Sequence, residues 1–288
     1  MGRFTLTWDG GRLDLGERTR IMGIVNVTPD SFSDGGRFFD PGAAAEHGER
    51  LAAEGADILD VGGESTRPFS DPVPAEEETR RVVPVVRELA RRVKTPVSVD
   101  TAKASVARAA LDAGAVIVND VSAGRMDPEL LPLAARRRVP VVLMHMKGTP
   151  RTMQKNPEYA DLIGEIREFL ADALRRAIEA GVERSRVILD PGIGFGKTFA
   201  HNLALIRHLD ALADLDAPIL IGASRKAFIR HLAREAGEPE PAPDGIAVER
   251  GAQAVVVAAA LAGAHIVRVH DVARTRDTLR VADAIRVA

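Results

Sequence analysis

The sequence predicts an α/β fold of a single domain, a (β/α)8 barrel of the TIM type. Short apolar runs alternate with helix-like stretches about eight times along the chain, which is the repeat count of such a barrel. A polar or charged side chain directly follows most of these runs. Because the carboxyl ends of all barrel strands share one face, these polar groups should gather at one place. The pattern therefore indicates an active site.

The predicted strands are rich in Val, Ile and Leu and nearly continuous in apolar character, as parallel strands covered on both faces should be. We place them at residues 21–26, 57–61, 97–100, 116–119, 140–144, 187–190, 219–222 and 266–269. Before them, residues 3–8 and 12–15 flank Asp9-Gly10-Gly11, a hairpin signal. We expect residues 1–18 to form a hairpin that closes the bottom of a barrel domain spanning residues 1–288.

Helical periodicity fills the gaps between these strands. The predicted helices cover residues 41–54, 75–93, 102–113, 127–137, 157–181, 200–213, 225–235 with 246–262, and 272–285. A glycine in the left-handed conformation commonly ends a helix before the next strand. Gly55, Gly114, Gly181 and Gly263 stand at such positions. The Pro- and Glu-rich segment 235–244 is predicted to be an exposed loop rather than a domain linker.

Composition excludes several classes of function. The net charge is −2, so no overall basic field favours nucleic acid. The chain has no cysteine, which excludes disulfides, thiolate metal sites and cysteine nucleophiles. No segment has the length of a membrane span, and the first ten residues lack the apolar core of a signal peptide. We expect a soluble cytoplasmic protein, and the scattered histidines do not predict a zinc site.

Three polar side chains at predicted strand ends suggest recognition of a heterocycle. Asp100, Asn119 and Asp190 each close an apolar run. Two carboxylates and an amide at one place can accept several hydrogen bonds from a flat, N–H-rich ring such as the edge of a pterin or guanine. The alternative is that each caps a following helix, since Asp and Asn are favoured there. Asp100, directly before Thr101, is the residue most open to that alternative.

Other features indicate a loop wall and an anion site. The long polar loops 26–36 and 62–68 are of the kind that can fold over a substrate. Residues 190–198, DPGIGFGKT, fail both the P-loop and the dinucleotide patterns, so we interpret them as a flat loop beside a ring. Lys226, Arg268 and His270 follow the last two strands, where such barrels frequently bind phosphate.

Beyond these features, the chain resembles the dihydropteroate synthase family. The motifs that carry the resemblance are, in the family's order, NVTPDSFSDGG, GGESTRP, SVDT, NDVSAG, LMHMKGTPRTMQ, DPGIGFGK, GASRKAFI and RVHDV. They extend from Ile21 to Val272. The resemblance implies a pterin-binding (β/α)8 barrel that joins 6-hydroxymethyl-7,8-dihydropterin diphosphate to 4-aminobenzoate. The products would be 7,8-dihydropteroate, for folate biosynthesis, and pyrophosphate.

The resemblance also implies roles for individual residues. Asp190 would hold the pterin amino group and ring N–H, with Asn119 and Asp100 on the remaining ring edge. Lys226 would reach the ring carbonyl and N5, and Arg268 would lie over the pterin face. The diphosphate would be bound by Asn26, Thr66, Arg268 and His270. The remaining substrate contacts implied are Val269, and Phe32, Arg67, Pro68 and Phe195 around the aminobenzoate.

The implied chemistry uses one cofactor, Mg²⁺, with Asn26 as its protein ligand. Pyrophosphate is a good leaving group once Mg²⁺, Arg268 and His270 take up its charge, so the pterin methylene can depart as a delocalised cation. Asp100 would stabilise that cation, and the aromatic amine would then attack it. Lys226 completes the catalytic set. Such a reaction requires no covalent enzyme intermediate.

One residue departs from the family's pattern. Ala227 follows the SRK lysine, where the family commonly has a serine whose hydroxyl helps to hold the aminobenzoate carboxylate. The family also suggests a homodimer formed through the late helices. Three alternatives remain: a pterin-binding methyltransferase, a non-catalytic pterin-binding barrel, and a phosphate-binding isomerase barrel. The diphosphate residues and the two long loops argue against the first, and the presence of Asn26, Lys226 and Arg268 argues against the second. The third is disfavoured because the chain has no evident Glu/His acid–base pair.

Overall fold

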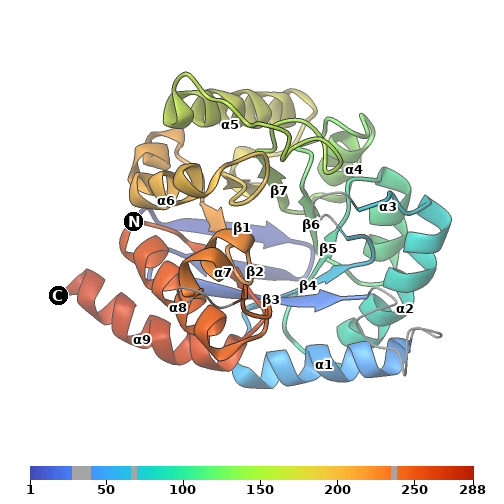
Figure 1. Cartoon of the computed structure of the whole chain (residues 1–288). Helices are drawn as coiled ribbons and strands as arrows, with labels where there is room; N and C mark the ends of the chain where they lie inside the picture. Colours follow the sequence, from blue (N-terminus) through green and yellow to red (C-terminus); the bar gives the residue numbers. More distant parts are fainter. Residues whose placement is uncertain (28–39, 66–69, 235–238) are drawn as a thin grey trace.

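Eight parallel strands form a nearly closed barrel surrounded by helices (Figure 1). The computed structural model describes residues 1–27, 40–65, 70–234 and 239–288. The strands are β3 (Arg20–Asn26), β4 (Ile58–Gly62), β5 (Val97–Asp100), β6 (Ile117–Asp120), β7 (Val141–Met144), β8 (Val187–Asp190), β9 (Leu220–Ile221) and β10 (Ile266–Val269). Their order is β8-β7-β6-β5-β4-β3-β10-β9. A bridge between Leu189 and Ile219 joins the two ends, and the predicted fold class is confirmed.

Helices follow the strands as predicted, with small differences at their ends. They are α1 (Pro41–Glu54), α2 (Ala75–Arg92), α3 (Ala104–Asp112), α4 (Leu130–Arg137), α5 (Leu162–Glu179), α6 (Phe199–Arg207), α7 (Ala227–Ala233), α8 (Ile246–Leu261) and α9 (Val272–Val287). The predicted helix 157–181 begins late because the Asp161 side chain caps it by accepting from the Gly164 amide. The predicted helix 200–213 ends at Arg207 and continues as a 3-10 helix, Leu209–Leu215.

Two sequence signals at helix and strand ends are confirmed. The four helix-ending glycines all have positive φ, between 93° and 114°, the conformation that lets a chain leave a helix without steric cost. The N-terminal hairpin consists of β1 (Phe4–Trp8) and β2 (Gly11–Leu15), paired antiparallel. Among the described residues, no helix is both long and apolar enough to cross a bilayer.

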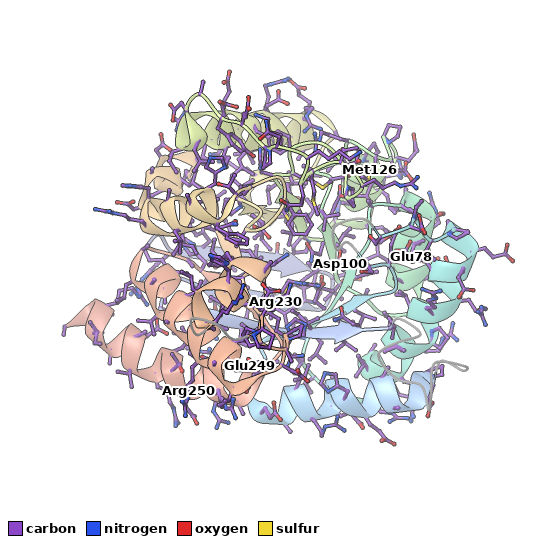
Figure 2. The ribbon with its side chains drawn as sticks, in the orientation of Figure 1. Glu78, Asp100, Met126, Arg230, Glu249 and Arg250 are labelled. Carbon is purple, nitrogen blue, oxygen red and sulfur yellow. The ribbon has the colours of Figure 1, made fainter. Side chains whose placement is uncertain are left out.

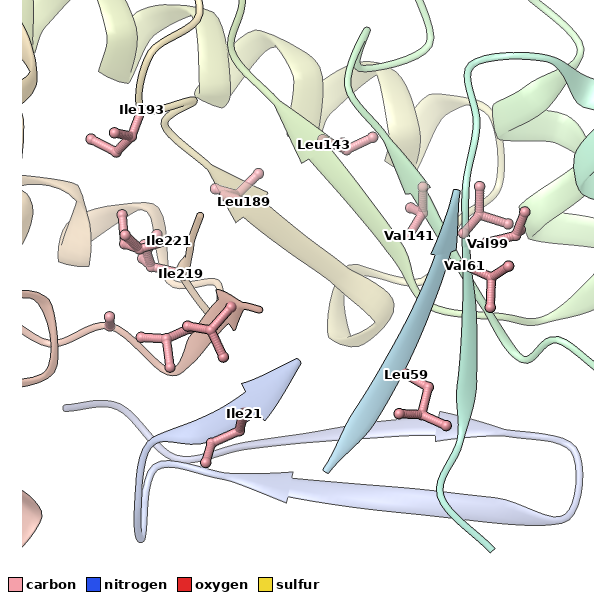
Figure 3. Packing of buried hydrophobic residues seen from close by; sticks show 14 of the residues in the cluster. Ile21, Leu59, Val61, Val99, Val141, Leu143, Leu189, Ile193, Ile219 and Ile221 are labelled. Carbon is pink, nitrogen blue, oxygen red and sulfur yellow. The ribbon is translucent and has the colours of Figure 1, made fainter. Parts of the chain in front are cut away.

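Alternation along the strands divides the core into two parts. Residues such as Leu59, Val61 and Leu189 face the helices and form the larger apolar cluster (Figure 3). The alternate residues face the barrel interior. A smaller cluster fills the amino-terminal end of that interior, and Leu6 and Leu15 of the hairpin pack against it. Its strand members are Met22, Ile58, Ile117, Val142, Ile188, Leu220 and Ile266.

The polar side chains lie one interior position further along the same strands. Two residues after the apolar members come Asp60, Asn119, Asp190 and Arg268, with the apolar Met144 at the corresponding position of β7. A side-chain period of two puts them on the same interior face, displaced toward the carboxyl ends of the strands. The fold therefore separates an apolar plug at one end of the barrel from a charged layer at the other.

Candidate active site

The three predicted hydrogen-bond acceptors lie at or next to the carboxyl ends of β5, β6 and β8. Asp100 pairs in register with Asn119 across β5 and β6, and Asp190 ends β8. Asn119 and Asp190 are buried, and the Asp100 side chain is 13% exposed. Asp100 lies near the centre of the ring of helices in Figure 2. The structure thus brings these predicted site residues together at the carboxyl-terminal face.

The capping alternative for these residues is wrong. Helix α3 begins at Ala104 with Lys103 as its N-cap, and the Ala104 amide donates to Oδ2 of Asp127 at 2.8 Å, not to Asp100. Asp100 instead accepts a hydrogen bond from Nη2 of Arg268 at 2.8 Å. The Asp190 carboxylate accepts from the Gly192 amide at 2.7 Å within its own loop, so it also caps no helix.

A fourth polar residue, Asp60 in β4, joins these groups. Its Oδ2 atom accepts from Nδ2 of Asn119 at 2.9 Å and from Nε of Arg268 at 2.6 Å. Arg268 therefore lies between two carboxylates, those of Asp60 and Asp100. Asp60 is fully buried. The sequence analysis missed it because it stands inside an apolar run, not after one; an acid inside a buried strand was the available signal.

Burial changes the acid–base properties of two carboxyl groups in this layer. It raises the pKa of Asp100 to about 7; Arg268 lowers that pKa, and Asp60 and other nearby carboxylates raise it. Burial likewise raises the pKa of Asp190 to about 6, against the lowering effects of the Gly192 amide and of Lys226. Both groups are costly to ionise in the ligand-free protein, so a ligand that donates N–H groups to them would stabilise their charged forms.

The glycine-rich loop after β8 forms a wall beside these carboxylates. A Cβ on Gly192 would lie 1.9 Å from the His145 carbonyl oxygen, so only glycine fits there. Phe195 is buried in an apolar cluster that includes Met144 and Val121. The Nζ atom of Lys226 lies 4.1 Å from the centre of the Phe195 ring, a cation–π distance. Phe195 thus packs beside the interior carboxylates with Lys226 against its ring.

Lys197, at the end of that loop, is the second residue that the sequence analysis missed. It is only 2% exposed, and its Nζ lies 2.9 Å from Nδ1 of His145 and 3.1 Å from the Phe195 carbonyl oxygen. Burial lowers the pKa of Lys197 to about 7. Burial also lowers the pKa of His145, to about 2, so a neutral imidazole accepts from the lysine. Lys197 thereby ties the wall to the end of β7.

The SRK segment sends three successive side chains in different directions. Arg225 has a φ of 60°, and its Nε donates to Oε1 of Glu249 in α8 at 2.8 Å; Figure 2 labels Glu249 on that helix. Ser224 Oγ lies 2.9 Å from Nδ1 of His270, just beyond β10. Lys226 is the N-cap residue of α7 and lies over Phe195. The segment therefore connects the ring wall to the predicted anion site.

The remaining predicted residues fall into two groups. Asn26 ends β3, and Val269 ends β10 with its side chain among the helix-facing residues, so only its backbone can face a ligand. The described residues contain no group of three or more carboxylate and imidazole ligands that could hold a metal ion. The predicted contacts Phe32, Thr66, Arg67 and Pro68 lie outside the described residues.

Comparisons with known proteins agree with this architecture. A family model described as "Pterin binding enzyme" matches residues 22–270. Dihydropteroate synthase of Mycobacterium leprae is 48% identical, over 88% of each chain. The Escherichia coli K12 enzyme is 43% identical, over 92% of this chain and 91% of its own.

Solved structures of dihydropteroate synthase are similar along the whole chain. The Xanthomonas albilineans enzyme with 4-aminobenzoic acid has a TM-score of 0.90 and 47% identity, with 100% of both chains covered. The same enzyme in complex with 7,8-dihydropteroate has a TM-score of 0.85 and 45% identity, with 99% of both chains covered. With this similarity in sequence and fold, the chain belongs to the dihydropteroate synthase family of pterin-binding enzymes.

Proposed function

We propose that this protein condenses 6-hydroxymethyl-7,8-dihydropterin diphosphate with 4-aminobenzoate, giving 7,8-dihydropteroate and pyrophosphate. The relatives that carry this activity in their names match most of the chain, and a similar enzyme has been solved with 7,8-dihydropteroate. The observation that carries the proposal is the buried layer in which acceptors and cations meet at one barrel face. A methyltransferase or a non-catalytic barrel would have no use for a diphosphate site beside it.

The pterin ring would be recognised by complementary donors and acceptors. Its amino group and ring N–H groups are donors, which match Asp190, Asp100 and the oxygen of Asn119. Its carbonyl oxygen is an acceptor, which matches the ammonium group of Lys226. Arg268 is fixed between two carboxylates and would lie against the ring face. Phe195 would close the side of the ring next to Lys226.

The diphosphate would bind where β10 ends. Arg268 and His270 supply donors there, and Ser224 Oγ, 2.9 Å from Nδ1 of His270, helps to orient the imidazole. Asn26 provides one amide oxygen, a ligand type that Mg²⁺ prefers. The described residues form no all-protein metal cage, which fits an ion held mainly by substrate phosphates and water. When bound, Mg²⁺ would withdraw charge from the leaving pyrophosphate.

This arrangement suits loss of pyrophosphate before the amine attacks. Arg268 and His270 would neutralise charge that grows on the leaving group, and the Asp100 carboxylate would stabilise positive charge on the pterin methylene. The Asp100 carboxyl group already contacts Arg268, so its position is preset. The aromatic amine is a sufficient nucleophile for such a cation, and no enzyme nucleophile is needed.

Assembly and location are further parts of the proposal. Exposed apolar side chains occur on the late helices: Leu232, Ile246, Leu261, Val281 and Ile285. Such side chains support a homodimer formed through α7 to α9, which light scattering would test; a monomer at micromolar concentration would contradict it. A cytoplasmic location stays a prediction from the sequence, to be checked by fractionating cells that produce the protein.

The activity itself has a direct test. The protein is incubated with the dihydropterin diphosphate and Mg²⁺, with and without 4-aminobenzoate, and pyrophosphate and pteroate are measured. Pyrophosphate release that depends on the amine, with an equal amount of dihydropteroate, is expected. Release without the amine, or no release in either reaction, would contradict the proposed condensation.

Asp190→Asn should weaken pterin binding and stabilise the ligand-free protein. The amide presents a donor where the carboxylate accepted, so pterin affinity should fall by about 1.5–3 kcal/mol in calorimetry. The folded-state pKa of Asp190, about 6, lies above the ordinary aspartate value of 3.8. The folded protein therefore binds this proton more tightly than the unfolded chain does, and wild type loses stability as pH rises from about 4 to about 6.

The Asp190→Asn variant has no titratable group at this position, so it should not lose stability between pH 4 and pH 6 as wild type does. Its unfolding free energy should exceed that of wild type by about 1–3 kcal/mol at pH 8, and the difference should shrink toward pH 4. Thermal unfolding at several pH values measures it. A difference that is independent of pH would show that Asp190 does not carry the raised pKa.

His270→Ala should weaken binding of the diphosphate substrate far more than binding of the free pterin alcohol. Only the diphosphate carries the anion that the imidazole contacts, so a loss of about tenfold or more is expected for it and little change for the alcohol. Ser224→Ala, which keeps the imidazole but removes its Oγ contact, is the control and should have a smaller effect. Equal losses for both ligands would place the phosphate site elsewhere.

Ala227→Ser should tighten binding of 4-aminobenzoate. The substitution restores a hydroxyl next to the proposed carboxylate position, and Ala227 is exposed at the first turn of α7. A hydrogen bond to a charged group in partly exposed geometry contributes about 1 kcal/mol, which predicts a roughly threefold to tenfold lower KM for the amine. Kinetics at saturating pterin diphosphate measure it. An unchanged or higher KM would mean that residue 227 does not face the carboxylate.

A further inference from the structure

We propose that Asp60 is a positioning residue of this active site, whose buried carboxylate fixes the orientation of the Asn119 amide and the Arg268 guanidinium toward the pterin. The proposal rests on the proposed function and adds a residue to it. Asp60 contacts other side chains rather than the substrate, so it would act through them.

The contacts of Asp60 cross the barrel interior. In the sheet order, Asn119 on β6 and Arg268 on β10 each lie two strands away from β4. Both nevertheless donate to the same oxygen, Oδ2 of Asp60, at 2.9 and 2.6 Å. One fully buried carboxylate thus connects two residues on strands that do not pair with each other.

The carboxylate decides which atom Asn119 offers to a ligand. An ionised carboxylate only accepts hydrogen bonds, so the amide must turn its NH2 group toward Asp60. The amide oxygen is then the atom left for a bound molecule. Without Asp60, Asn119 could present either a donor or an acceptor. With it, Asn119, Asp100 and Asp190 form a set of acceptors, which suits a ring edge that carries N–H groups.

The same contact orients Arg268. Its Nε is engaged by Asp60, and its Nη2 by Asp100. Because a guanidinium is planar and rigid, two carboxylates at these atoms fix the plane of the group. The side chain keeps 20% of its surface exposed, and its remaining N–H groups can face the substrate. The orientation is therefore set before a ligand binds.

A purely structural role is a poor account of Asp60. Its other oxygen, Oδ1, is buried and has no hydrogen-bond partner among the residues that the structure describes. An unsatisfied buried acceptor destabilises a fold, and a well-packed apolar side chain would serve stability better. Ile58, the preceding interior residue of the same strand, is apolar and belongs to the barrel core. It shows the residue type that packing alone would favour at an interior position.

The test compares Asp60→Asn with a matched control on the same strand. Asp57 is another nearly buried aspartate, with an 8% exposed side chain paired with Arg18 and Arg20, but it lies at the opposite end of β4. For Asp60→Asn we expect KM for the pterin diphosphate and Kd for the pterin alcohol to rise about tenfold or more. KM for 4-aminobenzoate should stay within about twofold. Asp57→Asn should lower the unfolding temperature without changing either KM.

A double-mutant cycle separates positioning from general damage. If Asp60 acts through Asn119, the effect of Asp60→Asn on pterin affinity should be clearly smaller in an Asn119→Ala background than in wild type. Additive effects would overturn that part of the proposal. Asp60→Asn that leaves pterin affinity unchanged, or that raises both KM values equally, would overturn it altogether. A wild-type protein without amine-dependent pyrophosphate release would instead contradict the proposed function.

A second variant applies if Asp60→Asn does not fold. Asn119→Asp keeps an oxygen for the ligand but replaces the donor to Asp60 with an acceptor. Loss of pterin affinity comparable to that expected for Asp60→Asn is the predicted result, because the hold of Asp60 on this side chain is removed. Unchanged affinity would show that the contact with Asp60 does not matter for binding.

Discussion

The charged layer of this barrel depends on Arg268. Asp60 and Asp100 both place a carboxylate oxygen against its guanidinium, and a buried carboxylate without a cation costs several kcal/mol. Arginine is suited to this position because it stays charged at any physiological pH and can engage two acceptors in one plane. Lysine, with one compact ammonium group, could not fix both carboxylates in the same way. The acceptor set of the site is therefore built around one cation.

Even with Arg268 present, ionisation of the buried carboxyl groups in this layer remains costly, as their raised pKa values show. Asp100 and Asp190 have pKa values near 7 and 6 in the ligand-free protein, because burial outweighs the nearby cations. A ligand whose N–H groups point at these carboxylates supplies the missing stabilisation of charge. The protein thus gives up some stability at the carboxyl-terminal face, and the same feature favours a donor-rich ring over a ring edge that offers only acceptors.

The sequence predicts most of this molecule because period-two alternation and helix-ending glycines are local signals. Three strands, 97–100, 187–190 and 266–269, have the predicted bounds, and the acceptors meet because strand ends share a face. Asp60 and Lys197 could not be found in this way. Asp60 lies inside an apolar run, and Lys197 follows a glycine-rich loop whose conformation the local sequence does not predict. Their importance arises from contacts 59 and 52 residues apart in sequence, which only the closed barrel reveals.

Asp57 and Asp60 illustrate how position in the barrel determines the role of a residue type. They stand three residues apart on or beside β4, and both are largely buried and bound to arginine. Asp57 accepts from Arg18, Arg20 and the Ile21 amide, so it joins the hairpin segment to the amino-terminal end of the barrel. Asp60 faces the interior, where its partners are residues of the proposed substrate site. Asp57, at the amino-terminal end of the strand, thus serves stability, and Asp60, toward the carboxyl-terminal end, serves the proposed active site.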